Sequence, residues 1–174
     1  MTSNAADKTP ALLCYDGSDV AGTAIEHAGT LLGGGAAVVL TVWESLGSAL
    51  LRYGPRARGP LSTDLREVSE EVIDEIDGRT AGEAQATAVE GAEIATAAGF
   101  DARPEARRAL ARAAERREVT VWRAILDVAD HEGAGVVVLG SRGRSGIRSA
   151  LLGSVSYGVV HHSRRPLLVV PPAD

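Results

Sequence analysis

The sequence has few of the residues on which disulfide-linked, metal-binding or membrane proteins depend. Its single cysteine, Cys14, excludes an intramolecular disulfide and any site made of several cysteines. Such a chain suits a reducing compartment, and we expect it in the cytoplasm. No apolar run approaches the roughly 18 residues of a membrane span, so we expect no membrane partner. Aromatic residues make up only 3% of a chain that is 45% hydrophobic, and a core of Ala, Val, Leu and Ile favours layered α/β packing.

Acidic residues are missing from one long stretch, although the whole chain has a formal net charge of -5. No Asp or Glu lies between Glu132 and Asp174, whereas Arg142, Arg144 and Arg148 fall within that stretch. A local excess of positive charge favours an anionic ligand. The acidic balance of the whole chain argues against nucleic acid as a partner, because nucleic-acid binders usually carry a broad basic surface.

Residues 136–154, VVVLGSRGRSGIRSALLGS, have the pattern of a phosphate-binding loop. The apolar run before Gly140 predicts a strand buried on both faces of a parallel sheet. Two residues separate Gly140 from Gly143, and nine separate Gly143 from Gly153. Glycines let backbone amides approach an anion, and Ser154 is expected to cap a helix whose first amides point to the same place. The alternative reading is a glycine-rich loop that serves only as a tight connection.

Segments of two kinds alternate along the rest of the chain. Buried strands are expected at 11–15, 36–43, 136–139 and 167–170, and a weak edge strand at 100–106 because it contains Pro104. Helices are expected at 19–32, 63–98, 120–132 and 154–162. This alternation predicts one doubly wound, Rossmann-like α/β domain, with five parallel strands in the order 3-2-1-4-5 and helices on both faces.

The sequence supports a more specific prediction for each of four segments. We expect a disordered tail at 1–10, before a single domain at 11–174. Residues 45–62 contain Gly, Pro and Arg without a period and predict a flexible loop or a lid. Residues 107–118 read as an arginine-rich insertion, a solvated loop or helix face; a basic nucleic-acid patch is the alternative that its interleaved Glu residues and lack of aromatics disfavour. In the helix at 63–98, Val72 and Ile76 are expected on the packed face and Asp77 on a solvated acidic face.

The predicted topology brings two distant stretches together. In the order 3-2-1-4-5, the first and fourth strands are neighbours where the winding reverses, and ligands of open α/β sheets bind there. Asp16 follows the first strand and Gly140 ends the fourth, so both should face one crevice. Asp16 is a candidate acceptor for ribose hydroxyls or, through water or a metal ion, for phosphates. Alternatively, it caps its own turn.

The spacing G-x2-G-x9-G-S, with the flanking VVVLGSRG and PLLVV, resembles the ATP-binding branch of the universal stress protein family from Ala11 to Pro171. The resemblance implies an adenine nucleotide alpha hydrolase-like fold and an adenine nucleotide ligand, ATP or else AMP or cAMP. It implies that Asp16 contacts the nucleotide, with Mg2+ held indirectly between Asp16 and the phosphates, and that the backbone of Val42 recognises adenine. The residues that it places at the phosphates and ribose are Gly140, Gly143, Gly153 and Ser154, with Ser141 and Arg142 as neighbours of the phosphates.

The last strand, Leu167 to Val170, is expected to be an exposed sheet edge. Antiparallel pairing with a second copy would cover such an edge. The resemblance implies the same homodimer.

The expected function is that of a nucleotide-binding regulator or sensor in the stress response. No residue is evidently placed as a base for an attacking water, so ATP hydrolysis is expected to be slow at most, and whether the protein is an enzyme stays open. One alternative is a protein-interaction module of the same fold with a vestigial nucleotide site. Another is an adenylate-forming or pyrophosphatase-like enzyme, which the missing signature residues disfavour.

Overall fold

Five parallel strands form one sheet in the computed structural model, which describes residues 9–46, 69–109, 121–143 and 152–172. The strand order is β3-β2-β1-β4-β5, and each neighbouring pair is parallel. The strands are β1 (Ala11–Cys14), β2 (Gly35–Glu44), β3 (Phe100–Ala109), β4 (Val136–Gly140) and β5 (Leu167–Val170). The strand order predicted from the alternation of segments is confirmed.

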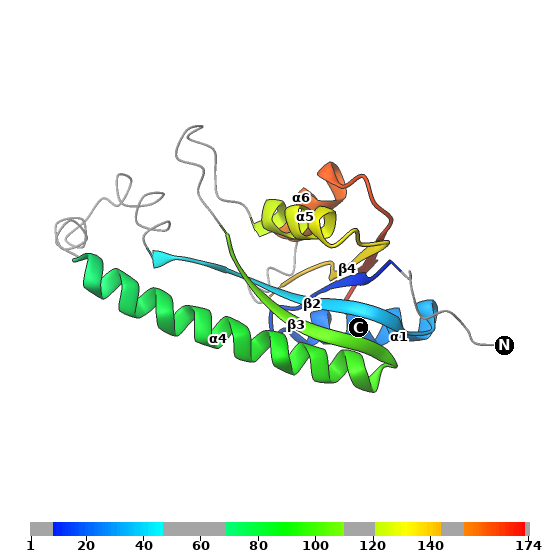
Figure 1. Cartoon of the computed structure of the whole chain (residues 1–174). Coiled ribbons are helices and arrows are strands. Elements are labelled where there is room, and N and C mark those ends of the chain that lie inside the picture. The colour runs from blue at the N-terminus through cyan, green and yellow to red at the C-terminus, as the bar shows by residue number, and fades with distance from the viewer. Residues whose placement is uncertain (1–8, 47–68, 110–120, 144–151, 173–174) are drawn as a thin grey trace.

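Helices cover both faces of this sheet, as predicted (Figure 1). They are α1 (Asp19–Leu32), α4 (Glu70–Ala97), α5 (Val121–His131) and α6 (Ser154–His162). On one face, α1 and α4 bury small side chains such as Ala24, Ala92 and Ala95 against the sheet. On the other face, Ile125 of α5 and Val159 of α6 close a second apolar layer. Since small aliphatic side chains fill both layers, aromatic residues are hardly needed.

The edge strand β3 is longer than predicted. Pro104 lies within it, which an outermost strand tolerates because one side of its backbone needs no partner. The strand continues past residue 106 to Ala109 because β2 offers a matching partner along its whole length. Residues 107–109 therefore belong to the sheet, and assigning them to an arginine-rich insertion was wrong.

Several predicted features lie outside the described residues. They are the tail at 1–8, the part of the expected loop or lid from 47 onward, the rest of the arginine-rich segment from 110, and the loop residues Arg144, Gly146 and Arg148. Within the described ranges, no helix is both long and apolar enough to cross a membrane.

The prediction of which residues of α4 pack against the sheet was wrong for the first half of the helix. Val72 and Ile76 are 43% and 37% exposed, whereas Asp77 is only 7% exposed. Counting back from the buried Ala84 in steps of three and four residues leads through residue 80 or 81 to Asp77 and Ile73, so the helical period places the carboxylate on the packed side.

The buried carboxylate of Asp77 joins three elements. Its Oδ1 accepts a hydrogen bond from the backbone N–H of Leu46, just after β2, at 2.6 Å. Its Oδ2 lies 3.2 Å from Nη2 of Arg108 in β3, and the Arg108 guanidinium lies over the Trp43 ring. Because a buried carboxylate is stable only when its oxygens are paired, this cluster fixes α4 against the ends of β2 and β3.

We predict that Asp77→Ala lowers the free energy of unfolding by about 1–3 kcal/mol, because it leaves the Leu46 amide without its acceptor. Urea denaturation followed by circular dichroism measures this change. Asp74→Ala, three residues earlier on the exposed side of α4, is the matched control and should have little effect. Equal midpoints for the two variants would contradict the role assigned to Asp77.

Candidate functional site

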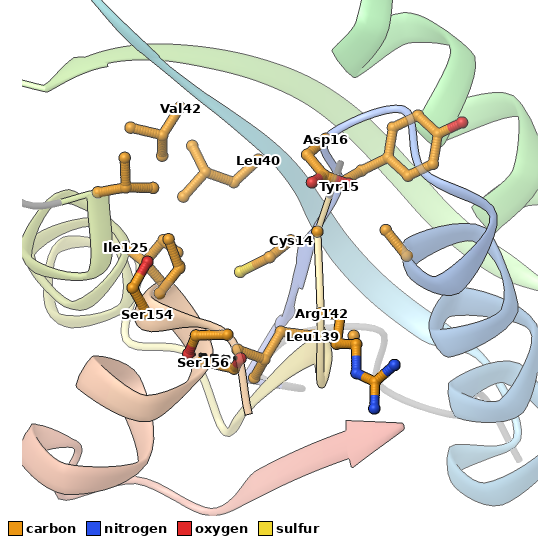
Figure 2. A pocket seen from close by; sticks show the side chains of 16 residues that line it. Cys14, Tyr15, Asp16, Leu40, Val42, Ile125, Leu139, Arg142, Ser154 and Ser156 are labelled. Carbon is orange, nitrogen blue, oxygen red and sulfur yellow. Dashed lines mark hydrogen bonds between the residues drawn. The ribbon is translucent and has the colours of Figure 1, made fainter. Parts of the chain in front are cut away.

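A cavity of about 360 Å³ opens at the carboxyl ends of β1 and β4, where the winding of the sheet reverses. Its lining comes from β1, β2, β4, α1, α5, α6 and the turns after β1 and β4 (Figure 2). It contains Asp16, Val42, Gly140, Arg142, Gly143, Gly153 and Ser154, which are seven of the eight predicted site residues. The topology therefore brings together residues that lie more than a hundred positions apart in the sequence.

One side of the cavity is apolar. Figure 2 shows Leu40, Val42 and Ile125 grouped together there, with Cys14 beside them. Such a surface suits a flat, uncharged ring system. Burial, with a smaller contribution from the negative charge of Asp16, raises the pKa of the Cys14 thiol to about 12. The thiol is therefore protonated near neutral pH, although Cys14 is only partly buried.

The glycine loop after β4 forms the opposite side. A Cβ at Gly140 would lie 2.9 Å from Cγ1 of Val20, and one at Gly143 only 2.5 Å from Oδ2 of Asp16. Both approaches are too close for any other residue without displacement of the neighbour. The φ angle is not positive at Gly140, Gly143 or Gly153. Close approach of the backbone is therefore what requires glycine at Gly140 and Gly143.

Asp16 has the turn role that the sequence offered as an alternative, and it also lines the cavity. Its Oδ1 accepts hydrogen bonds from the backbone N–H and the hydroxyl of Ser18, at 3.1 and 2.5 Å. The Ser18 hydroxyl in turn caps α1 by accepting from the Ala21 N–H. Asp16 is thus a turn residue through Oδ1, while Oδ2 faces Gly143 within the cavity.

Tyr15 fixes the segment that carries Asp16, and sequence reasoning missed it. Its ring lies against α4 where a Cβ at Gly91 would come within 2.7 Å. Its hydroxyl donates to Glu90 at 2.7 Å, and its carbonyl accepts from Thr41 Oγ1 at 2.9 Å. Burial and the hydrogen bond to Glu90 raise the pKa of Tyr15 to about 12. A tyrosine at the end of a buried strand was the one available signal.

The start of α6 closes the cavity on the side of Gly153. Gly153, not Ser154, is the N-cap, so that part of the prediction was wrong. Ser154 is the first helical residue and is exposed. Within the described part of the chain, its hydroxyl makes no hydrogen bond. The first amides of a helix lack acceptors within the helix and carry a partial positive charge. The N-terminal turn of α6 therefore presents donors to the cavity.

Ser141 lies behind the lining rather than in it. Its side chain is 5% exposed, and its backbone N–H donates to the Val170 carbonyl in β5 at 2.7 Å. Its carbonyl accepts from the Gly153 N–H at 2.8 Å and from the Ser156 hydroxyl at 2.6 Å. Sequence reasoning missed Ser156, which lies three residues after the observed N-cap, Gly153.

The sequence model of the universal stress protein family matches residues 9–171. The chain belongs to the universal stress protein family. A relative within that family is universal stress protein E of Escherichia coli K12, which is 50% identical over 48 residues. The aligned segment covers 28% of this chain but only 15% of that relative. The resemblance that the glycine spacing indicated is thereby confirmed at the level of the family.

Solved structures of the family show the same fold. The protein MJ0577 of Methanocaldococcus jannaschii superposes with a TM-score of 0.70 at 20% identity, over 95% of this chain and 97% of that one. A universal stress protein in complex with cAMP gives 0.55 at 23% identity, over 93% and 96%. The universal stress protein from Archaeoglobus fulgidus in complex with dAMP gives 0.54 at 18% identity, over 94% and 98%.

The single thiol offers a direct probe of the cavity. Because thiolate is the reactive form and burial raises the Cys14 pKa to about 12, iodoacetamide at pH 8 should label the folded protein at least roughly a hundredfold more slowly than the unfolded protein. Mass spectrometry measures both rates, and Cys14→Ser is the unlabelled control. Labelling of the folded chain at the rate of a free thiol would contradict the environment described for Cys14.

Proposed function

We propose that this universal stress protein binds an adenine nucleotide in the cavity between β1 and β4 and acts as a regulator or sensor in the stress response. ATP is the first candidate, as in the ATP-binding branch of the family, and AMP and cAMP are the others. The observation that carries the proposal is one cavity with an apolar side at Val42 and a glycine-lined, donor-rich side at Gly143 and Ser154. The family structures with cAMP and dAMP support the same ligand class.

The two sides of the cavity suit the two ends of a nucleotide. The base would lie against Leu40, Val42 and Ile125, where the Val42 backbone is the predicted partner of adenine. The phosphates would lie between the glycine loop and the first turn of α6, whose amides favour an anion. Arg142 lines this side and adds a positive charge. Ser141 contributes through the backbone that holds the loop, because its side chain does not line the cavity.

Mg2+ fits this arrangement only together with the phosphates. A phosphate at Gly143 would lie next to the Asp16 carboxylate, and a cation between them would relieve that repulsion. Mg2+ typically takes one or two carboxylates, several waters and phosphate oxygens. Among the described residues, no group of three or more His, Cys, Asp or Glu could hold a metal ion on its own. We therefore propose that Asp16 holds Mg2+ indirectly, through the bound triphosphate.

The cavity favours binding over catalysis. Asp16 is the one carboxylate among its lining residues in the described part of the chain, and Oδ1 of Asp16 is already engaged by Ser18. A base that activates water must be within hydrogen-bond reach of it and free to accept a proton. We propose at most slow ATP hydrolysis, with nucleotide occupancy itself as the signal.

A homodimer through β5 completes the proposal. β5 is outermost in the sheet and consists of Leu167, Leu168, Val169 and Val170, with no charge or proline to block pairing. The opposite edge, β3, carries Pro104 and alternating charges, which discourage pairing there. The carbonyls of Pro166 and Val170 face β4, so the alternating backbone groups of Leu167 and Val169 face outward.

We predict micromolar binding of ATP with Mg2+, measured by calorimetric titration of nucleotide-free protein, and weaker binding without Mg2+. Asp16→Asn removes the charge but keeps an oxygen for the Ser18 hydrogen bonds, so it should bind ATP with little dependence on Mg2+ while the fold is retained. AMP and cAMP titrated in parallel identify the preferred ligand.

Two results would contradict this proposal. An unchanged Mg2+ dependence in Asp16→Asn would leave Asp16 with its turn role alone. No binding of any of the three nucleotides by the folded wild-type protein would favour the interaction module with a vestigial site.

We also predict a light-scattering mass of two chains at micromolar concentration. Val169→Pro removes an outward N–H without touching a β4 hydrogen bond, and should give a folded monomer. Val169→Ala loses a similar side chain but keeps that N–H, and should remain a dimer. A wild-type mass of one chain, or an unaffected Val169→Pro dimer, would exclude pairing through β5.

A further inference from the structure

The two halves of the glycine loop are joined by hydrogen bonds that converge on one carbonyl. Gly140 ends β4 and Gly143 lies in the turn that follows, whereas Gly153 caps α6 and Ser154 starts it. Within the described residues, the Ser141 carbonyl links these halves by accepting from the Gly153 N–H at 2.8 Å and from Ser156 Oγ at 2.6 Å. The Ser156 hydroxyl also lies 3.2 Å from the Gly153 carbonyl. One side chain thus contacts both halves of the loop.

Ser156 is among the residues that line the cavity, but its hydroxyl is bonded to protein carbonyls. Its residue exposure is 3%, and its Oγ is engaged by protein carbonyls. Ser154, two positions earlier, is exposed at the first turn of the same helix. The two serines therefore have different roles. The Ser154 hydroxyl is available at the cavity, whereas the Ser156 hydroxyl fixes the helical turn on which Ser154 lies.

The hydrogen-bonded frame formed by Ser141, Gly153 and Ser156 is anchored to the sheet. Ser141, whose carbonyl it contacts, donates its own N–H to Val170 at the end of β5. The position of the first turn of α6 relative to Gly143 consequently depends on a continuous series of bonds from β5 through Ser141 to Ser156. Amides that bind an anion must be held at hydrogen-bond distance from it, and small displacements weaken every such contact.

We propose that Ser156 is a positioning residue for the phosphates of the bound nucleotide. This inference rests on the proposed nucleotide binding and adds a residue that determines recognition of the phosphate end. Loss of the hydroxyl leaves the α6 turn bonded to the Ser141 carbonyl through the Gly153 N–H alone. The apolar side of the cavity, formed by Leu40, Val42 and Ile125, is not part of this frame. Affinity for the phosphates should therefore fall while affinity for the nucleoside persists.

The test compares ATP with adenosine, because their affinity ratio isolates the phosphate contribution from general damage to the fold. In Ser156→Ala, we expect ATP binding to weaken about tenfold, the size of one well-placed hydrogen bond, and adenosine binding to change less than about twofold. Ser163→Ala is the matched control. Ser163 is the C-cap of the same helix, and its hydroxyl also bonds to backbone atoms, those of Arg165. It is not among the residues that line the cavity.

A second pair keeps the test valid if Ser156→Ala does not fold. Ser156→Thr and Ser156→Val have nearly the same shape and differ in the hydroxyl, so the proposal predicts a larger ATP-to-adenosine affinity ratio for the threonine variant. Equal ratios in this pair, or equal losses for ATP and adenosine in Ser156→Ala, would overturn the positioning role. Failure of the wild-type protein to bind either ligand would instead refute the proposed function on which this inference rests.

Discussion

The reversal of winding between β1 and β4 is the constraint on which the site depends. Right-handed crossovers carry the chain outward from β1 to β3 on one side and from β4 to β5 on the other. The helices that follow β1 and β4 therefore lie on opposite faces and leave the carboxyl ends of these strands uncovered. Asp16 and Gly140 are adjacent in space for this reason alone, and the cavity is a product of topology before any side chain is considered.

Close packing then turns this opening into a site with two different sides. Glycine at positions 140 and 143 lets the backbone, without a side chain, approach Val20 and Asp16. The aliphatic residues of β2 and α5 line the opposite side without offering polar side chains. Burial keeps Cys14 protonated, so the charged side chains among the described lining residues are Asp16 and Arg142. A ligand that satisfies both sides needs a flat apolar part and an anionic part.

Sequence patterns predicted the sheet order and seven of the residues that line the cavity, because strand alternation and glycine spacing are local and periodic. They failed where a residue's role depends on contacts across the fold. Asp77 looked like one more acid on a charged helix, yet the period of α4 places it under β2 and β3. Ser154 was taken for the cap of α6, because sequence alone does not show at which residue the helix begins. The importance of Ser156 and Tyr15 appears only when their partners, Ser141 and Glu90, are brought close in space.

The central claim is that the glycine loop and the first turn of α6 hold the phosphates of a nucleotide. The most direct measurement is an amide NMR titration of isotope-labelled protein with ATP and Mg2+. The account predicts that the largest shifts occur at Gly140, Gly143, Gly153 and Ser154. Saturable shifts confined to another surface, such as the shallow hollow between α1 and α4 around Gly29 and Ala98, would contradict it, as would the absence of any shift.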